Sequence, residues 1–218
     1  MPTPTPTPAP GSPPVAARSH PVYTVHELMP NAPSNAIALT IDDGPDPRWT
    51  PQVLALLDRH GLKATFFLVG YRVRTHPGLA RRIVAAGHSV GNHTYNHRIP
   101  FTGLSAAQID AEIGNGQTAI LEETGYSPRL ARTPGGAYDT TILAKIAEHG
   151  LIPVNWDVDP KDWSRPGTAT IEARLLATRP GDILLCHDGG GDRSQTVAAL
   201  ADAIPALLTR GLRFVPLT

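Results

Sequence analysis

Short apolar runs alternate with amphipathic segments along most of this chain, as they do in parallel α/β folds. Strands are predicted where three to five mostly apolar residues lie between turn residues, at 37–41, 65–69, 88–91, 130–132, 152–156, 183–186 and 213–216. Helices are predicted where apolar residues recur every three or four positions, at 50–59, 77–86, 105–123, 140–149, 170–177 and 196–210. Ser105 has the side chain that a helix N-cap needs, so we expect it to begin the third helix.

The number of strand–helix units bears on the architecture. About seven units fit within residues 35–218, whereas a complete eightfold barrel takes ~250 residues. We therefore expect class α/β and a distorted, incomplete, about sevenfold parallel β/α barrel. An open doubly wound sheet is less favoured, because no glycine-rich dinucleotide or phosphate loop of the expected spacing occurs.

The N-terminal segment differs in composition from the rest. It begins as a repeat of Pro and Thr, which cannot bury a core and favours an extended, polyproline-like chain. We divide the chain into a disordered linker or tail at 1–34 and a folded domain at 35–218. A linker of this kind commonly joins an extra module or an anchor to a domain outside the cell, and a tail without a role is the alternative.

Composition and charge exclude several classes of protein. Lys plus Arg and Asp plus Glu both number 19, so the net charge is zero and we expect no nucleic-acid partner. A single cysteine, Cys186, excludes an internal disulfide and lies in a predicted strand, where we expect it to be buried. No apolar run approaches the ~20 residues of a membrane span, and the N-terminus has no apolar core of a signal peptide.

Polar residues cluster directly after five of the predicted strands. The clusters lie at 40–45, 92–97, 132–136, 156–163 and 187–191. In β/α barrels the carboxyl ends of the strands form one mouth, which holds the active site. We therefore expect these five segments to surround one site.

Two of these clusters contain residues that could bind a metal. A spacing of four would put His93 and His97 on one face of a helical turn, close enough to share a cation, although such pairs are also common on surfaces. Asp43 could supply a carboxylate oxygen, and two histidines with one carboxylate leave positions open, as in catalytic sites. The neighbouring Asp42 could then act as a base. Alternatively, Asp42 and Asp43 could have only a structural role, in a turn beside Gly44.

Together the clusters resemble a known family. Five motifs of the polysaccharide deacetylase family (carbohydrate esterase family 4, the NodB homology domain) occur in order: Thr-Ile-Asp-Asp-Gly-Pro at 40–45, His-x-x-x-His at 93–97, Arg-x-Pro-Gly-Gly at 132–136, Asp-x-x-Asp-Trp at 159–163 and Leu-Cys-His at 185–187. The resemblance covers essentially all of 35–218, which would be the catalytic domain. The first two motifs are highly specific in combination.

The resemblance implies a role for each acidic and metal-binding residue. Asp42 would be the general base, and Arg132 would orient it and stabilise its charge. The metal ligands would be Asp43, His93 and His97. The metal would be a divalent ion, with Zn²⁺ as the default and Co²⁺, Ni²⁺ or Mn²⁺ as alternatives.

It also implies the remaining parts of the site. His187 would be the general acid, held by Asp162, whose carboxylate should favour the protonated imidazole. Trp163 and Leu185 would wall the groove around the acetyl group, and the backbone N–H of Gly135 would help to bind the oxyanion. Many members carry an aromatic residue where this chain has Gly135, so substrate contacts on that side are expected to be looser.

The expected reaction is metal-dependent hydrolysis of an acetyl group on a polysaccharide. N-acetylglucosamine units of peptidoglycan or chitin-like oligomers are the favoured substrate. Acetylated xylan is the first alternative, because an ester can use the same groups and a Pro/Thr linker suits a multi-module xylan-degrading enzyme. A carbohydrate-binding module without catalysis is the second. We expect an extracellular or cell-wall-associated protein.

Overall fold

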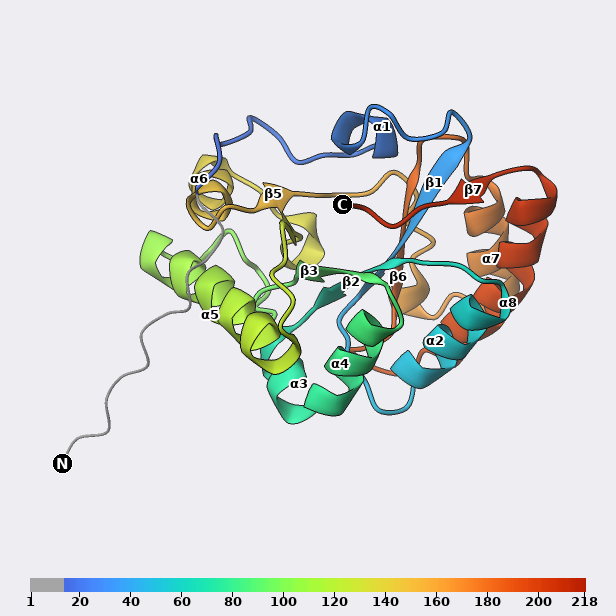
Figure 1. The fold of residues 1–218 in the computed structure, drawn as a ribbon, viewed down its shortest axis with the longest axis horizontal. Coiled ribbons are helices and arrows are strands. Elements are labelled where there is room, and N and C mark those ends of the chain that lie inside the picture. Colours follow the sequence, from blue (N-terminus) through green and yellow to red (C-terminus); the bar gives the residue numbers. More distant parts are fainter. Residues whose placement is uncertain (1–13) are drawn as a thin grey trace.

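A curved, parallel sheet forms the centre of the computed structural model, which describes residues 14–218 (Figure 1). Within that range its seven strands are β1 Ala36–Asp42, β2 Thr65–Leu68, β3 Ser89–Asn92, β4 Leu130–Ala131, β5 Ile152–Pro153, β6 Ile183–His187 and β7 Arg213–Phe214. The order is β5-β4-β3-β2-β1-β6, and β7 pairs with the start of β1. All the ladders are parallel.

The helices cover the outside of this sheet (Figure 1). They are α2 Thr50–Arg59, α3 Gly70–Thr75, α4 Pro77–Ala85, α5 Ala106–Thr124, α6 Thr140–Glu148, α7 Thr168–Leu176 and α8 Ser194–Thr209. The short helix α1 Val25–Leu28 instead buries Val25 in one cluster with Ala36 and Ala38 of β1. Ser105 caps α5 as predicted, and Gln108 completes a capping box. The prediction missed α1 and α3, which are too short to show a period. No helix in the described range is long and apolar enough for a membrane span.

The sheet is an incomplete parallel barrel, which confirms the predicted fold class. Its two ends, β5 and β6, are not joined by a ladder of their own. Isolated bridges lie there instead, pairing Val22 with Val154, Thr24 with Asp182, and Val158 with Leu184. The distortion of the barrel is therefore concentrated between β5 and β6.

Alternation along the strands decides which side chains reach the barrel interior. In β1, Ile37, Leu39 and Ile41 point outward into the core shared with α2, α4, α7 and α8. Ala36 and Ala38 point into the inner core instead. Because successive side chains alternate between faces, the same inner face continues to the carboxyl end of β1, where the first acidic residue of the site lies.

The predicted domain boundary at residue 35 is too late along the chain. Val22 and Val25 are fully buried in the inner core, and the Thr24 side chain accepts the N–H of Glu27 to cap α1. These few apolar residues are spread among polar ones, so they gave no periodic signal. Residues 14–20 are mostly exposed, and the Pro/Thr repeat at 1–13 lies outside the described residues.

Candidate active site

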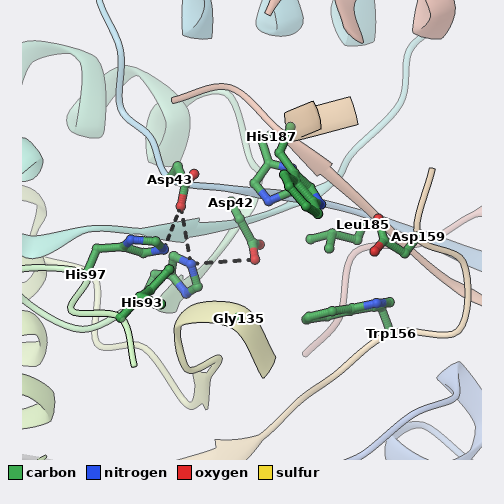
Figure 2. Close-up of a pocket in the computed structure, with 11 residues that line it drawn as sticks. Asp42, Asp43, His93, His97, Gly135, Trp156, Asp159, Leu185 and His187 are labelled. Carbon is green, nitrogen blue, oxygen red and sulfur yellow. Dashed lines mark ion pairs between the residues drawn. The ribbon is translucent and has the colours of Figure 1, made fainter. Parts of the chain in front are cut away.

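A cavity of about 360 Å³ opens where the strands end (Figure 2). Residues from all five of the predicted clusters line it, together with Ile99 and Leu185: Asp42, Asp43, His93, His97, Gly135, Trp156, Asp159, Trp163 and His187. The structure therefore brings nearly all the predicted site residues to one mouth. Arg132 and Asp162 lie behind this lining, and both are fully buried.

Asp43, His93 and His97 form a cluster that could hold a metal ion. Their ligand atoms lie within 4.8 Å of one another. Asp43 Oδ1 is 3.0 Å from His97 Nε2 and 3.4 Å from His93 Nε2 (Figure 2). This oxygen is buried, and no protein group in the described range hydrogen-bonds to it. A buried oxygen without a partner that faces two imidazole nitrogens fits a divalent cation.

The charge on Asp43 suits that role. Burial alone would raise the pKa of this carboxyl group, but the neighbouring His93 and His97 lower it well below its ordinary value. The backbone of Asp43 has a φ of 72°, in the left-handed region that Asp tolerates better than most residues. A Cβ atom at Gly189 would lie 2.1 Å from the Asp43 carbonyl oxygen, so this tight turn requires glycine there.

The two histidines are close for a reason other than the predicted one. Residues 93–97 form an irregular loop and not a helical turn. Thr94 and His97 have φ values of 64° and 54°, which fold the loop back on itself. The two imidazole rings meet with their centres 4.9 Å apart. The predicted pairing of His93 and His97 is correct, and its helical explanation is wrong.

Glu112, on α5, holds this loop and was missed by the sequence reasoning. Its carboxylate is buried and accepts the backbone N–H groups of Tyr95 and Asn96 at 3.1 and 2.7 Å. It also accepts the Asn96 side-chain amide at 2.7 Å and pairs with Arg98 at 3.1 Å. A charged residue at a position of α5 that the helical period places among buried residues was the signal that could have identified it.

Asp42 is joined to a different partner from Asp43. Its Oδ1 accepts a hydrogen bond from Arg132 Nη1 at 2.8 Å. The same nitrogen donates to Thr40 Oγ1, and the rest of the guanidinium donates to the carbonyls of Val154 and Asn155. The buried charge of Arg132 thus has acceptors from two sides of the barrel.

Arg132 also orients one of the histidines. His93 Nδ1 lies 2.7 Å from the Arg132 carbonyl oxygen, which can only accept. Nδ1 therefore carries the proton, and Nε2 is left with a free lone pair toward the cluster. Backbone partners of this kind orient metal-binding histidines in other proteins.

His187 and Asp162 form a second acid–base pair across the cavity. Asp162 Oδ1 is 2.7 Å from His187 Nδ1, while Oδ2 accepts the His187 backbone N–H and the Thr196 hydroxyl. Burial would lower the pKa of His187, but the Asp162 contact outweighs it and raises the pKa to about 9. Burial likewise raises the pKa of Asp162, but the His187 contact dominates and lowers it. The imidazole is therefore protonated at neutral pH.

The walls of the cavity include residues to which the sequence gave no role. Gly135, Trp163 and Leu185 line it as predicted. Trp156 lies on the same wall, with its ring 5.5 Å from the Arg132 guanidinium carbon. Trp156 is the first residue of the polar cluster at 156–163, and this position could have identified it from the sequence as part of the cavity wall.

Comparison with known proteins supports a relationship along most of the chain. The sequence profile of a family described as polysaccharide deacetylase matches residues 30–154. A peptidoglycan-N-acetylglucosamine deacetylase of Bacillus cereus is 43% identical over 182 residues, which cover 82% of this chain and 84% of that protein. A chitooligosaccharide deacetylase of a Bradyrhizobium species is 42% identical over 84% of this chain and 90% of that protein.

Solved structures share the fold. A crystal structure of a peptidoglycan N-acetylglucosamine deacetylase, in complex with a substituted benzamide, aligns with a TM-score of 0.83 at 34% identity over 90% of both chains. A protein of Bacillus anthracis described as a pseudoenzyme of carbohydrate esterase family 4 aligns with a TM-score of 0.81 at 30% identity. That alignment covers 90% of this chain and 67% of the other.

The contacts of Glu112 predict an effect on metal binding. Replacing Glu112 with Gln removes the charge that holds the loop at 93–97, so we expect zinc affinity to fall by about 10- to 100-fold. Competition with a chromophoric chelator measures it. Glu122→Gln, which removes an exposed carboxylate from the same helix, should leave the affinity unchanged. Equal affinities for both variants and the unmodified chain would contradict this role.

The Asp162 contact predicts the titration of His187. In the metal-free protein, NMR of the imidazole nitrogens should give a pKa of about 9 for His187. In Asp162→Asn the pKa should fall, because burial still lowers it and the largest of the contacts that raise it, the one with the Asp162 carboxylate, is gone. The folded-state pKa of His187 lies above 6.5, so the contribution of this imidazole to stability is complete below pH 6.5 and is lost as the pH rises through about 9. The lowered pKa of Asp162 means that its contribution is lost in the opposite direction, as the pH falls through the folded-state pKa of Asp162. An unchanged pKa in the variant would refute the pairing.

Proposed function

This chain belongs to the polysaccharide deacetylase family, and we propose that it removes acetyl groups from N-acetylglucosamine units of a polysaccharide by metal-dependent hydrolysis. One observation carries the proposal: the cluster of Asp43, His93 and His97 shares a cavity with Asp42 and His187. A metal site, a base and an acid around one cavity are what hydrolysis of an amide requires.

The metal would be held by Asp43, His93 and His97. Two imidazole nitrogens and one carboxylate oxygen form a frequent catalytic donor set for Zn²⁺, and the same donors accept Co²⁺, Ni²⁺ or Mn²⁺. When bound, a divalent ion supplies Lewis acidity toward the acetyl carbonyl and the attacking water. The unpartnered oxygen of Asp43 supports this assignment.

Asp42 would take the proton from the attacking water. Its carboxylate lines the cavity and is held by the buried Arg132 guanidinium. That contact leaves Oδ2 facing the cluster, 3.7 Å from His93 Nε2. The Asp42 carboxylate lies beside the metal ligands but pairs with Arg132 and not with the metal. It would therefore be free to act as a base.

His187 would give a proton to the departing sugar amine. Its protonated state at neutral pH and its position on the cavity wall support this role, and Asp162 would keep it oriented. The Gly135 N–H would stabilise the oxyanion, a contact that in other hydrolases is worth roughly 3 kcal/mol. Leu185 and Trp163 would enclose the acetyl methyl group.

The relatives support an aminosugar polymer as the substrate. The relatives cited above are named for peptidoglycan N-acetylglucosamine and for chitooligosaccharides. We propose that the protein would act on such a substrate outside the cell or in the wall, where an extra module or anchor joined through the Pro/Thr-rich segment would hold it. An ester substrate, as the xylan alternative requires, is consistent with one neighbour described as a family 4 carbohydrate esterase of Streptomyces lividans in complex with acetate, a description that names no polymer. The retained acid, base and ligands argue against a binding module without catalysis.

Acetate release tests the proposal. We expect the zinc-loaded protein to release acetate from peptidoglycan or N-acetylated chitin oligomers in preference to acetylated xylan, and a chelator to abolish release. Asp42→Asn should keep the metal but lower kcat by roughly 10²- to 10⁴-fold. His93→Ala should lose the metal, measured by elemental analysis.

Three outcomes would overturn parts of this proposal. A preference for xylan would make the protein an esterase, and no release from any substrate would make it a binding module. Activity of Asp42→Asn near that of the unmodified chain would refute the assignment of the base. Asp58→Asn, an exposed change on α2, is the matched control and should alter neither metal content nor activity.

A further inference from the structure

A buried acid packs against the turn that carries the metal ligand Asp43 and has no part in the proposed chemistry. Asp188 directly follows β6, and its side chain is fully buried. It is not among the residues that line the cavity, so it does not face the substrate. Burial raises the pKa of Asp188 to about 7, which reflects the cost of charging it there. One of its carboxyl oxygens, Oδ1, has no hydrogen-bond partner within residues 14–218.

The hydrogen bonds of Asp188 join the end of β6 to the first loop of the site. Its backbone N–H donates to the Asp42 carbonyl at 3.1 Å. Its Oδ2 accepts the hydroxyl of Thr50, the first residue of α2, at 2.6 Å. The Thr50 hydroxyl in turn accepts the backbone N–H of Asp46 at 2.8 Å. Asp188 and Thr50 therefore hold both ends of the segment 42–46, in which the metal ligand lies.

Between these two ends the carboxyl group is in direct contact with the backbone. A Cβ atom at Gly44 would lie 2.3 Å from Asp188 Oδ1, so only glycine lets the carboxyl group pack this closely. Gly189, the next residue after Asp188, packs on the Asp43 carbonyl. The segment that follows β6 thus supports the metal ligand on two sides.

The backbone of Asp43 needs such support. Its φ of 72° lies in the left-handed region, which a residue other than glycine keeps only where the surrounding structure fixes it. A change in this backbone conformation would move the carboxylate away from His93 and His97. The contacts of Asp188 with Gly44 and Thr50 are the ones that hold the loop on the far side from the histidines.

We propose that Asp188 is a positioning residue for the metal site and acts through its hydrogen bond with Thr50. This inference rests on the proposed function, which assigns Asp43 as a metal ligand. Asp188 would keep the Asp43 carboxylate aimed at the two histidines before a metal ion arrives. Such pre-organisation lowers the cost of binding. Loss of the hydrogen bond should therefore weaken metal binding beyond any effect on the stability of the fold.

Zinc binding by matched threonine variants tests the proposal. Thr50→Val keeps the shape of the side chain but removes the hydroxyl, so zinc affinity, measured by competition with a chromophoric chelator, should fall about tenfold. Thr50→Ser keeps the hydroxyl and should bind zinc as the unmodified chain does. Thr178→Val is the matched control, because Thr178 is equally buried and donates an equally short hydrogen bond, 2.6 Å to the Leu175 carbonyl. It should leave zinc affinity unchanged.

Further measurements separate positioning from a general loss of stability. Affinities are compared at a temperature at which the metal-free variants are fully folded, as their melting curves establish. Of the two valine variants, only Thr50→Val should change the visible d–d spectrum of the cobalt-loaded protein. If Thr50→Val folds poorly, Thr50→Ser and Thr50→Ala still differ by the hydroxyl oxygen alone. Asp188→Ala should also weaken zinc binding, and adding Thr50→Val should weaken it no further, because the two side chains act as one unit.

The outcomes distinguish this proposal from the proposed function. Equal zinc affinities of Thr50→Val and the unmodified chain would overturn the role of Asp188, as would an equal loss in Thr178→Val or in Thr50→Ser. Zinc binding that depends on Thr50, without acetate release by the unmodified chain, would refute the hydrolase and leave this role in place. Acetate release together with zinc affinity that does not depend on Thr50 would do the reverse.

Discussion

The buried guanidinium of Arg132 holds the site together. A positive charge with no exposed surface persists only where acceptors surround it. Its side chain joins Asp42 on β1 to the carbonyls of the chain that follows β5, and its own carbonyl orients His93. Substitution of Arg132 would remove the hydrogen bonds that hold the Asp42 carboxylate and join the two sides of the barrel, whereas the backbone carbonyl at this position would still bond to His93. Fold and chemistry therefore depend on the same set of hydrogen bonds.

The left-handed turn at Asp43 gives two adjacent acids different partners. In an extended strand, side chains of consecutive residues point to opposite faces. The φ of 72° at Asp43 breaks that alternation, so Asp42 and Asp43 line one cavity. Arg132 then neutralises the first, and the histidines accompany the second. Arg132 offsets the charge of Asp42, and a divalent ion bound between Asp43 and the histidines would offset the charge of Asp43, which would limit the repulsion between the two acids.

The strand pattern and the five polar clusters predicted the barrel and the residues at its mouth, because alternation and strand ends are properties of local sequence. The contacts of Arg132 with Asp42 and of Asp162 with His187 were inferred only through the resemblance to a family, since they join residues far apart in the chain. Glu112, the loop conformation at 93–97 and the packing of Val22 depend on tertiary contacts, and neither a period nor a motif marks them.

The central claim is that Asp43 binds the metal and Asp42 does not. A crystal structure of the zinc-loaded protein, with data at the zinc absorption edge, tests it most directly. The account predicts one ion bound by Asp43, His93 and His97. Asp42 should remain hydrogen-bonded to Arg132 and should not bind the ion. An ion bound by Asp42, or located away from the two histidines, would contradict it.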